Sequence, residues 1–545
     1  MYVRKKRNSS GSISIQIIKK IKGKSKLIET IGCSKDKKEI EKLYKRGLER
    51  IKELEPNLFD ISEQKEQEIK FLSISNSQII PIGDELFFGK LYDKLKLNDI
   101  FKDTKDIRYK KEKEFLLKSL VISRILYPGS KLYLADYLWH FKKKEIDTEK
   151  IYRFLDNLYQ DEIKKRIEDV VYNYTLSKID NQLVVSFYDV TTLYFESESE
   201  DDLRQIGFSK EGKLARPQIQ LGLFTTLEGY PLSYEVYHGK KYEGHTLIEA
   251  LIEFQKRFKL KDKPIVVADR GMLNDNNIAF LENNDYRYIL GAKIKMLPQN
   301  IKDEIANFIF INDNITHQVD IEKSIKYKDN PTDKKATKTL NIKQRIILSY
   351  STQRAKKDTK MREKALKRLK DKIEYSNSIT KSDLKLSHYA KYLDIEDDCK
   401  IEFKLNNQKI DNDAKLDGIK GFITNDFTLK HRDIIEHYQN LWHIERAFRI
   451  SKTDLQIRPI YHRLENRIKS HILISFIAYA IYKEFEIKTR EIKKEYKISY
   501  KILRDLIKHI FAIKVDDEVI PIKLSDIQQK FYDALHSDIS LSKSG

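Results

Sequence analysis

Residues 183–292 contain strand-like and helix-like segments in an order that few folds allow. Three strand-like segments come first and read "LVVSFYDVTTLYF", "QIQLGLFTT" and "PLSYEVY". A helix over 246–258, a strand over 264–269, a helix over 274–283 and a strand over 286–292 are then expected. Successive strands favour antiparallel hairpins, whereas a strand–helix–strand order favours a parallel crossover. The sequence therefore predicts a mixed α/β sheet flanked by helices.

A hydrophilic segment, residues 295–415, interrupts this α/β pattern. It is rich in Lys and Asn, with strand-like pieces at 345–351 and 399–405 and a strongly charged helical pattern at 356–373. We interpret it as an inserted strand-and-helix domain whose charged helix is solvent-exposed. The α/β pattern resumes with a strand at 418–425.

The ends of the chain carry other patterns. Residues 11–32 alternate as a basic β-hairpin that turns near Gly23, and a charged helix is expected over 36–54. Residues 83–180 have helical periodicity, and 470–486 is expected to be an apolar core helix. The predicted segments are a hairpin with a charged helix (1–80), a helical domain for DNA binding or dimerisation (81–180), the first part of the α/β core (181–294), the inserted domain (295–415), the second part of the core (416–489) and a helical tail (490–545).

The chain carries a large positive charge. It has 104 Lys and Arg residues against 83 Asp and Glu residues, a net charge of +21. Such a chain attracts polyanions, so nucleic acid is the expected partner. The alternative is a compositional drift toward Lys, which far outnumbers Arg.

Cysteine content and hydropathy restrict the compartment. Cys33 and Cys399 cannot form a disulfide framework or a four-ligand metal site. The most apolar run, at 472–482, is too short to span a bilayer. We therefore expect a soluble, cytoplasmic protein with no membrane partner.

Three carboxylates occupy positions where chemistry can occur. Asp189 lies within the first strand, Asp269 ends the strand at 264–269, and Glu445 lies on a helix after the insertion. Oxygen ligands of this kind favour Mg²⁺ or Mn²⁺. Two such ions can support an in-line displacement at phosphorus, and no Cys or His cluster competes for them.

The stretch "YQNLWHIERAFRISK" at 438–452 is expected to be one helix. A spacing of seven places Tyr438, Glu445 and Lys452 in one row, with Arg449 beside them. An apolar stripe on the flank of this row comprises Leu441, Ile444, Phe448 and Leu455. A mixed row beside a buried stripe indicates a cleft wall, although such residues are also common on a solvated helix face.

Three blocks of the sequence carry a resemblance to a known family. "FYDVTTLYFES", "VVADRGM" and "YQNLWHIERAFRISK" followed by "LQIRPIYHRLENRIKSHILISFIA" resemble the insertion-sequence DDE transposases of the Y-(2)-R-(3)-E-(6)-K signature group. The order of the blocks and the insertion before the Glu match that group over about 183–485. Leu441 stands where the signature has Arg.

The resemblance implies an RNase H-like catalytic core in which Asp189, Asp269 and Glu445 bind two Mg²⁺ or Mn²⁺ ions. It also implies that Tyr438 and Lys452 contact phosphates of the transposon end. Charge and geometry add further candidates for DNA binding, which are Arg446, Arg449, Arg270 and Arg458. The alternative for these arginines is a set of ordinary surface ion pairs.

The function expected from the resemblance is that of a DNA transposase. Such an enzyme binds the terminal inverted repeats, cleaves the ends and joins the 3′-hydroxyl to target DNA, as a homodimer in a synaptic complex on the nucleoid. Excision through a hairpin intermediate is a further implication. The alternatives are a catalytically silent, transposase-derived DNA-binding protein and a metal-dependent nuclease without strand transfer.

Overall fold

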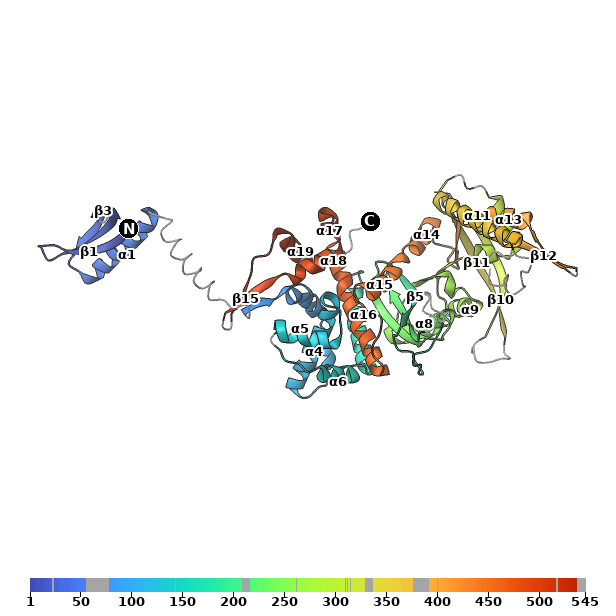
Figure 1. Cartoon of the computed structure of the whole chain (residues 1–545), viewed down its shortest axis with the longest axis horizontal. Coiled ribbons are helices and arrows are strands. Elements are labelled where there is room, and N and C mark those ends of the chain that lie inside the picture. The colour runs from blue at the N-terminus through green and yellow to red at the C-terminus, as the bar shows by residue number, and fades with distance from the viewer. Residues whose placement is uncertain are drawn as a thin grey trace. The chain divides into compact units, whose positions relative to one another are not determined.

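The computed structural model describes residues 1–21, 24–54, 78–142, 144–207, 216–260, 262–308, 310, 312–313, 315–328, 337–375, 392–398, 400–515 and 518–536. The predicted turn near Gly23 lies outside these residues, as does Cys399. The chain forms two compact units, Met1–Ile80 with Phe511–Ile522, and Pro81–Ile510 with Lys523–Gly545. Figure 1 labels their helices and strands.

In the first unit, three antiparallel strands pack against one helix. They are β1 (Tyr2–Arg7), β2 (Ile13–Ile21) and β3 (Lys24–Ser34), with α1 (Lys37–Leu54) as the helix. Alternation along β2 buries Ile15 and Ile17 completely. The hairpin and the charged helix expected here are confirmed. A further small sheet has the order β16-β15-β4 and consists of β16 (Glu518–Pro521), β15 (Phe511–Val515) and β4 (Ile79–Pro81).

The second unit is built on one eight-stranded sheet. In spatial order its strands are β10 (Thr316–Tyr327), β11 (Lys338–Tyr350), β14 (Ile419–Thr424), β9 (Tyr288–Gly291), β8 (Ile265–Ala268), β5 (Val185–Tyr194), β6 (Gln218–Thr225) and β7 (Pro231–His238). β5, β8 and β9 are parallel, and the other neighbours are antiparallel. The order β9-β8-β5-β6-β7 confirms the predicted RNase H-like mixed sheet.

The segment predicted as an insertion lies between β9 and β14. Its strands β10 and β11 extend the main sheet next to β14. Its other elements are η6 (Ile294–Met296), α10 (Gln299–Asn307), α11 (Thr352–Tyr375), the hairpin of β12 (Leu393–Asp398) and β13 (Lys400–Leu405), and α13 (Asn407–Ala414). Arg362 of α11 donates to Asp417 Oδ1 over 2.6 Å, which holds α11 beside the start of β14.

The helices of the second unit lie on both faces of the sheet and around α16. They are η2 (Asp84–Gly89), α3 (Lys90–Lys94), η3 (Leu97–Phe101), α4 (Ile107–Leu126), α5 (Lys131–Lys142), α6 (Thr148–Leu158), α7 (Asp161–Leu176), η4 (Glu243–His245), α8 (Thr246–Phe258), η5 (Arg270–Met272), α9 (Asp275–Asn283), α14 (His431–Gln439), α15 (Trp442–Thr453), α16 (Glu465–Lys488), α17 (Arg490–Tyr496), α18 (Tyr500–Lys508) and α19 (Asp526–His536).

Side chains alternate between the two faces of the sheet. On one face, Tyr188 of β5 and Ala268 of β8 belong to the apolar cluster that includes α8 and α9. On the other face, Phe187 and Val267 belong to the cluster that includes α14, α15 and α16. Residues one step along either strand therefore face different helices. This alternation determines which side of the sheet carries the site.

Helix α16 is the centre of the helical part. Almost every residue from Ile468 to Glu486 is buried, because α3, α4, α6, α7, α15 and α19 pack around it. This confirms the predicted apolar core helix and extends it at both ends. Among the described residues, no helix is both long and apolar enough to cross a bilayer.

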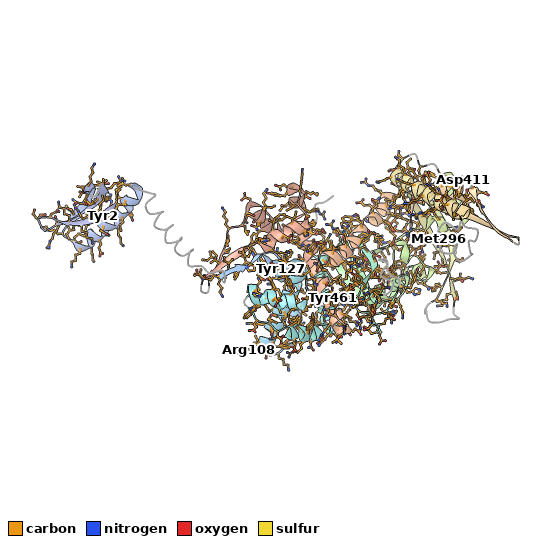
Figure 2. The ribbon with its side chains drawn as sticks, viewed as in Figure 1. Tyr2, Arg108, Tyr127, Met296, Asp411 and Tyr461 are labelled. Atoms are coloured by element: carbon orange, nitrogen blue, oxygen red, sulfur yellow. The ribbon has the colours of Figure 1, made fainter. Side chains whose placement is uncertain are left out.

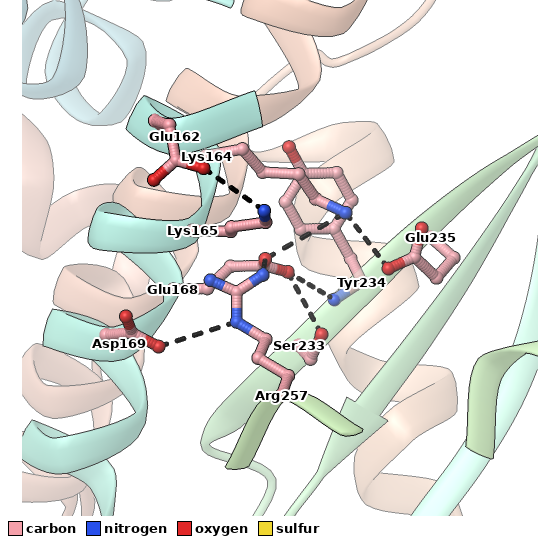
Figure 3. A network of polar contacts seen from close by, with 9 residues as sticks. All are labelled: Glu162, Lys164, Lys165, Glu168, Asp169, Ser233, Tyr234, Glu235 and Arg257. Carbon is pink, nitrogen blue, oxygen red and sulfur yellow. Dashed lines mark hydrogen bonds and ion pairs between the residues drawn. The ribbon is translucent and has the colours of Figure 1, made fainter. Parts of the chain in front are cut away.

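A buried ion network joins α7 to the sheet (Figure 3). Glu168 of α7 is fully buried and accepts from Ser233 Oγ at 3.0 Å and from the Tyr234 backbone N–H at 3.2 Å. Arg257, at the end of α8, pairs with the same carboxylate. Lys164 Nζ lies 3.8 Å from it and bonds Glu235 at 2.9 Å. These contacts fix α7 and α8 against β7.

Candidate active site

Two aspartates occupy equivalent positions on neighbouring strands. β5 and β8 are parallel, and their last paired residues are Tyr188 and Ala268, so Asp189 and Asp269 follow directly in register. Because side chains alternate, both carboxylates lie on the face covered by α14 and α15. Asp189 is half-buried and Asp269 is exposed. The fold therefore places these two carboxylates side by side.

Tyr438 of α14 contacts the second of these carboxylates. Its hydroxyl donates a hydrogen bond to Asp269 Oδ1 over 3.0 Å, and its ring packs on Phe422 with centroids 4.8 Å apart. Burial raises the pKa of Tyr438, and the charges of Asp269 and Asp189 raise it further. A Cβ added at Gly291 would lie 2.3 Å from the tyrosine oxygen. The phenol therefore reaches Asp269 through the space that a glycine on β9 leaves open.

The expectation of one helix over 438–452 is wrong. Helix α14 ends at Gln439 and α15 begins at Trp442, so Tyr438 lies on a different helix from Glu445 and Lys452. The backbone N–H groups of Leu441, His443 and Ile444 each donate to the carbonyl of the residue three positions earlier, at 2.9 to 3.1 Å. This tighter turn breaks the α-helical register. The apolar stripe on this segment is confirmed, because Leu441 and its three partners are buried.

A cavity of about 820 Å³ opens between these elements. Asp269, Tyr438 and Glu445 line it, together with Trp442 and Leu441. The basic side chains on its wall are Arg270, Lys293, Lys295, Arg354 and Lys420. Exposed Met296, labelled in Figure 2, also lines it.

The electrostatics of this cavity favour an anion. Burial and the neighbouring Arg354 lower the pKa of Lys420, whereas the charge of Glu445 acts in the opposite direction. Lys295 is paired with Asp413 at 2.8 Å, and Arg354 Nε lies 3.5 Å from Asp358. The cavity wall therefore carries more basic side chains than carboxylates, and such a surface attracts a chain of phosphate groups.

The three carboxylates are not positioned as the ligands of one metal ion would be. Within the part of the chain that the structure describes, no three Asp, Glu, His or Cys side chains are placed to hold one metal ion. Asp189 lies beside Asp269, while Glu445, from α15, lines the same cavity as Asp269. The donor set nevertheless fits Mg²⁺ or Mn²⁺, because all three groups are carboxylates and Asp269 and Glu445 are exposed.

The other predicted DNA-binding residues are distributed around α15. Arg270 lines the cavity. Arg446 instead donates through Nε to Glu486 of α16 at 2.8 Å, on the buried side of the helix. Arg449 is exposed, Lys452 is half-buried, and Arg458 lies 5.5 Å from the ring of Tyr194. Of the described residues that line the cavity, none is Arg446, Arg449, Lys452 or Arg458.

Four basic residues of the cavity wall were not predicted. Lys293 and Lys295 follow the strand at 286–292, which ends at the same edge of the sheet as Asp269, and this position was the available signal. Lys420 alternates with buried residues on β14. Arg354 lies on α11, two residues before the charged helical pattern predicted at 356–373, and pairing of β11 with β14 brings the start of that helix to the site.

Comparison with known proteins identifies the family. A family model described as a transposase DDE domain matches residues 180–481. No curated protein matches the chain.

Three solved structures are similar. The cryo-EM structure of the piggyBac transposase synaptic complex with hairpin DNA is 10% identical, over 84% of this chain and 82% of that one, with a TM-score of 0.34. The crystal structure of the Mos1 mariner paired end complex with Mn is 12% identical, over 29% and 54%, with a TM-score of 0.14. The Mos1 transposase paired-end complex with left transposon end is 12% identical, over 29% and 53%, with a TM-score of 0.15.

These TM-scores are low, so the assignment rests on the family model. That model covers more than half of the 545 residues, and its range includes both strands that carry the aspartates and the helix that carries Glu445. The chain belongs to the transposase DDE domain family.

Proposed function

We propose that this chain is a DNA transposase of the Y-(2)-R-(3)-E-(6)-K group, which cleaves the inverted-repeat ends of its element and joins the 3′-hydroxyl to target DNA. One observation carries the proposal. Asp189 and Asp269 follow in register on adjacent strands, and Asp269 shares a basic cavity with Glu445 inside the matched DDE domain. Acids that are far apart in the sequence therefore lie near one basic surface, and a surface of this kind can bind DNA.

Asp189, Asp269 and Glu445 are the residues that would hold two Mg²⁺ or Mn²⁺ ions. Bound there, such ions supply activation of the attacking oxygen and stabilisation of the leaving oxygen in a phosphodiester displacement. Tyr438 holds one oxygen of Asp269 by its hydrogen bond and leaves the other oxygen available. Because Glu445 lies on a separate helix, its position relative to the aspartates depends on the turn between α14 and α15.

The basic wall supplies the DNA contacts. Arg270, Lys293 and Lys420 present charge to a strand that lies over Asp269, and each phosphate they neutralise releases counterions. Tyr438, Lys452, Arg449, Arg446 and Arg458 remain proposed contacts on and around α15. The enzyme would act as a homodimer that pairs two ends, in the cytoplasm on the nucleoid, and excision would pass through a hairpin.

The test is a cleavage assay on a supercoiled plasmid that carries the element's own ends. Asp189→Asn, Asp269→Asn and Glu445→Gln are each expected to abolish Mg²⁺-dependent nicking and joining while DNA binding persists. Matched controls are Asp275→Asn and Glu436→Gln, which change exposed acids on α9 and α14. Cutting by all three variants at the wild-type rate would end the proposal. Cutting without joining by the wild-type chain would favour a nuclease, and binding without cutting would favour a silent DNA-binding protein.

A further inference from the structure

A second group of cations lies away from the cavity, and it is buried. Arg124 of α4 and Lys131, the first residue of α5, are only 6% and 5% exposed. His471 of α16 is 5% exposed, and half-buried His462 lies with its ring centroid 5.5 Å from that of His471. These four side chains, here named the α5 cation cluster, come from three helices and the loop that follows α15.

Arg124 contacts another member of the α5 cation cluster and the loop that follows α15. Arg124 Nη1 lies 3.5 Å from the carbonyl oxygens of Leu455 and Gln456, and Nη2 lies 3.3 Å from His471 Nδ1. His471 Nε2 lies 2.9 Å from the Ile457 carbonyl. The Nη1 group of Arg124 therefore contacts the loop after α15, and the Nη2 group contacts α16. Its Nε atom is buried with no hydrogen-bond partner among the described residues.

Lys131 has no counterion within the described part of the chain. Among the described residues no carboxylate forms an ion pair with Lys131 or Arg124, and the carboxylate beside His462, Asp156, is already bonded by Arg467 at 2.6 and 2.8 Å. Burial and the charge of Arg124 lower the pKa of Lys131 well below its usual value. Burying two neighbouring cations without an acid is costly.

The end of α5 increases this cost. Lys131 stands at the first position of a 12-residue helix, where the unpaired N–H groups carry partial positive charge and favour anions over cations. Ser130 caps this end through its hydroxyl, which accepts from the Tyr133 N–H at 3.0 Å. Desolvation, the guanidinium and the helix end therefore all disfavour a second cation here, and the guanidinium and the helix end favour an anion.

The surface around the α5 cation cluster suits nucleic acid. Tyr461, labelled in Figure 2 and next to His462, is 77% exposed, and Arg463 is also exposed. Tyr133 and Leu132, next to Lys131, are exposed as well. Exposed aromatic rings beside basic groups are typical of surfaces that bind nucleic acid strands.

The loop beside the cluster also connects it to the candidate active site. This loop leaves α15, the helix of Glu445, and the N–H of Ile460 bonds the Tyr194 carbonyl at the end of β5, the strand of Asp189. A ligand bound at the cluster would therefore contact the segment that joins both catalytic elements.

We propose that Lys131 and Arg124, at the amino end of α5, form a binding site for one phosphate group of the DNA backbone. The phosphate supplies the negative charge that the protein does not place there. It is held by the Lys131 ammonium and by the end of α5, and the buried Arg124 guanidinium beside them adds positive charge. That the phosphate belongs to DNA rests on the proposed function, whereas binding of a phosphate group does not.

The experiment compares Lys131→Met with the wild-type full chain, because Met keeps an unbranched side chain of similar length and removes the charge and the N–H donors. Lys131→Gln is a second variant that keeps a hydrogen-bond donor. Lys165→Met is the matched control, since Lys165 is an exposed lysine on α7 that pairs with Glu162 at 3.2 Å. The far-UV circular dichroism spectrum of each variant, and its Tm in sodium chloride alone, serve as the check of folding.

Two measurements separate the possible sources of the phosphate. In thermal unfolding, sodium phosphate is expected to raise the Tm of wild type and Lys165→Met, relative to sodium chloride of equal ionic strength, by more than it raises the Tm of either Lys131 variant, whose remaining rise reports the cavity and the general effect of phosphate. In anisotropy titrations of a 30-bp duplex at several salt concentrations, Lys131→Met is expected to bind about tenfold more weakly. Its slope of log affinity against log salt should be shallower by about 0.9, the value for one phosphate.

The outcomes are distinct. Equal responses of wild type and Lys131→Met in both measurements would overturn the proposal and make the cluster purely structural. A phosphate response that Lys131→Met loses, with unchanged DNA binding, would assign the site to free phosphate and overturn its assignment to DNA. If the wild type bound no duplex, the proposed function would fail while the phosphate measurement still decided the site. Asp269→Asn should keep both responses.

Discussion

The hydrogen bond between Tyr438 and Asp269 depends on the missing side chain of Gly291, and a double-mutant cycle can test this dependence. In Gly291→Ala the new Cβ would lie 2.3 Å from Tyr438 Oη. Atoms of this kind need roughly 3.4 Å, so the phenol must move by about 1 Å. The present hydrogen bond is 3.0 Å long. After that displacement it would exceed hydrogen-bonding distance.

The expected magnitude follows from the type of bond that is lost. A hydrogen bond to a carboxylate is worth about 1.5–3 kcal/mol, which corresponds to roughly a tenfold to hundredfold loss of rate if it holds Asp269 in the reactive position. Tyr438→Phe removes the hydroxyl and keeps the ring against Phe422. Each single variant should therefore slow Mg²⁺-dependent end cleavage by that factor. The double variant should be no slower than the slower single variant, because the atom nearest the new Cβ is gone.

The assay is single-turnover cleavage of a labelled transposon end, with thermal unfolding of each variant as a check of folding. Gly271→Ala is the matched control, because a Cβ added at Gly271 would have no atom within 4 Å. It should cleave within about twofold of wild type. Multiplication of the two single effects in the double variant would refute the reasoning, since independent sites give additive free energies. Full activity of Tyr438→Phe would also refute it.

Three further predictions concern stability and metal. Glu168→Ala removes the fully buried carboxylate of the network and leaves Arg257 only its contact with exposed Asp169, so it should lower the free energy of unfolding by about 3–5 kcal/mol in urea titrations, whereas exposed Lys165→Ala should change it by less than about 0.5 kcal/mol. Burial first, and then the charge of Lys483, lower the pKa of His443 to about 4. The unfolded chain then binds its proton at higher pH than the folded chain, so stability should fall between about pH 6.5 and 4, and His443→Gln should fall less steeply. Removal of divalent metal with EDTA should stop end cleavage and leave the circular dichroism spectrum unchanged, because apolar clusters hold the strands that carry the acids; unfolding by EDTA would contradict this.

The sheet and its two aspartates could be predicted from the sequence because each rests on a strong local signal. Alternating residues on β5 and an uninterrupted apolar run on β8 identify the strands, and both Asp189 and Asp269 are placed by strand position alone. Two hairpins followed by a strand–helix–strand crossover favour a β8 that is parallel to β5, and the structure shows that the two strands are adjacent. Local pattern and topology together are sufficient for this half of the site.

The other half depends on tertiary contacts that no local pattern contains. The turn between α14 and α15 separates residues whose spacing fits one continuous helix. Nothing in the local sequence around Arg446 indicates that its guanidinium bonds Glu486, 40 residues later. Lys420 and Arg354 reach the cavity because β11 and β14 pair in the sheet. No periodic pattern in a sequence indicates which residue a charged side chain will contact, so these contacts can be known only from the folded structure.

The structure also gives a physical reason for a leucine at position 441, where the signature group has Arg. Leu441 is 6% exposed, lies in the tight turn between α14 and α15, and packs in the same apolar cluster as Ile444 and Phe448. A guanidinium there would have to remain solvated or paired, because burial of an unpaired charge costs several kcal/mol. The positive charge missing at this position stands elsewhere on the same cavity wall, on Arg270, Lys293, Arg354 and Lys420. The chain thus combines an apolar turn, which holds the two helices on the core, with a basic surface contributed by other segments, so the cavity is positively charged without an arginine at position 441.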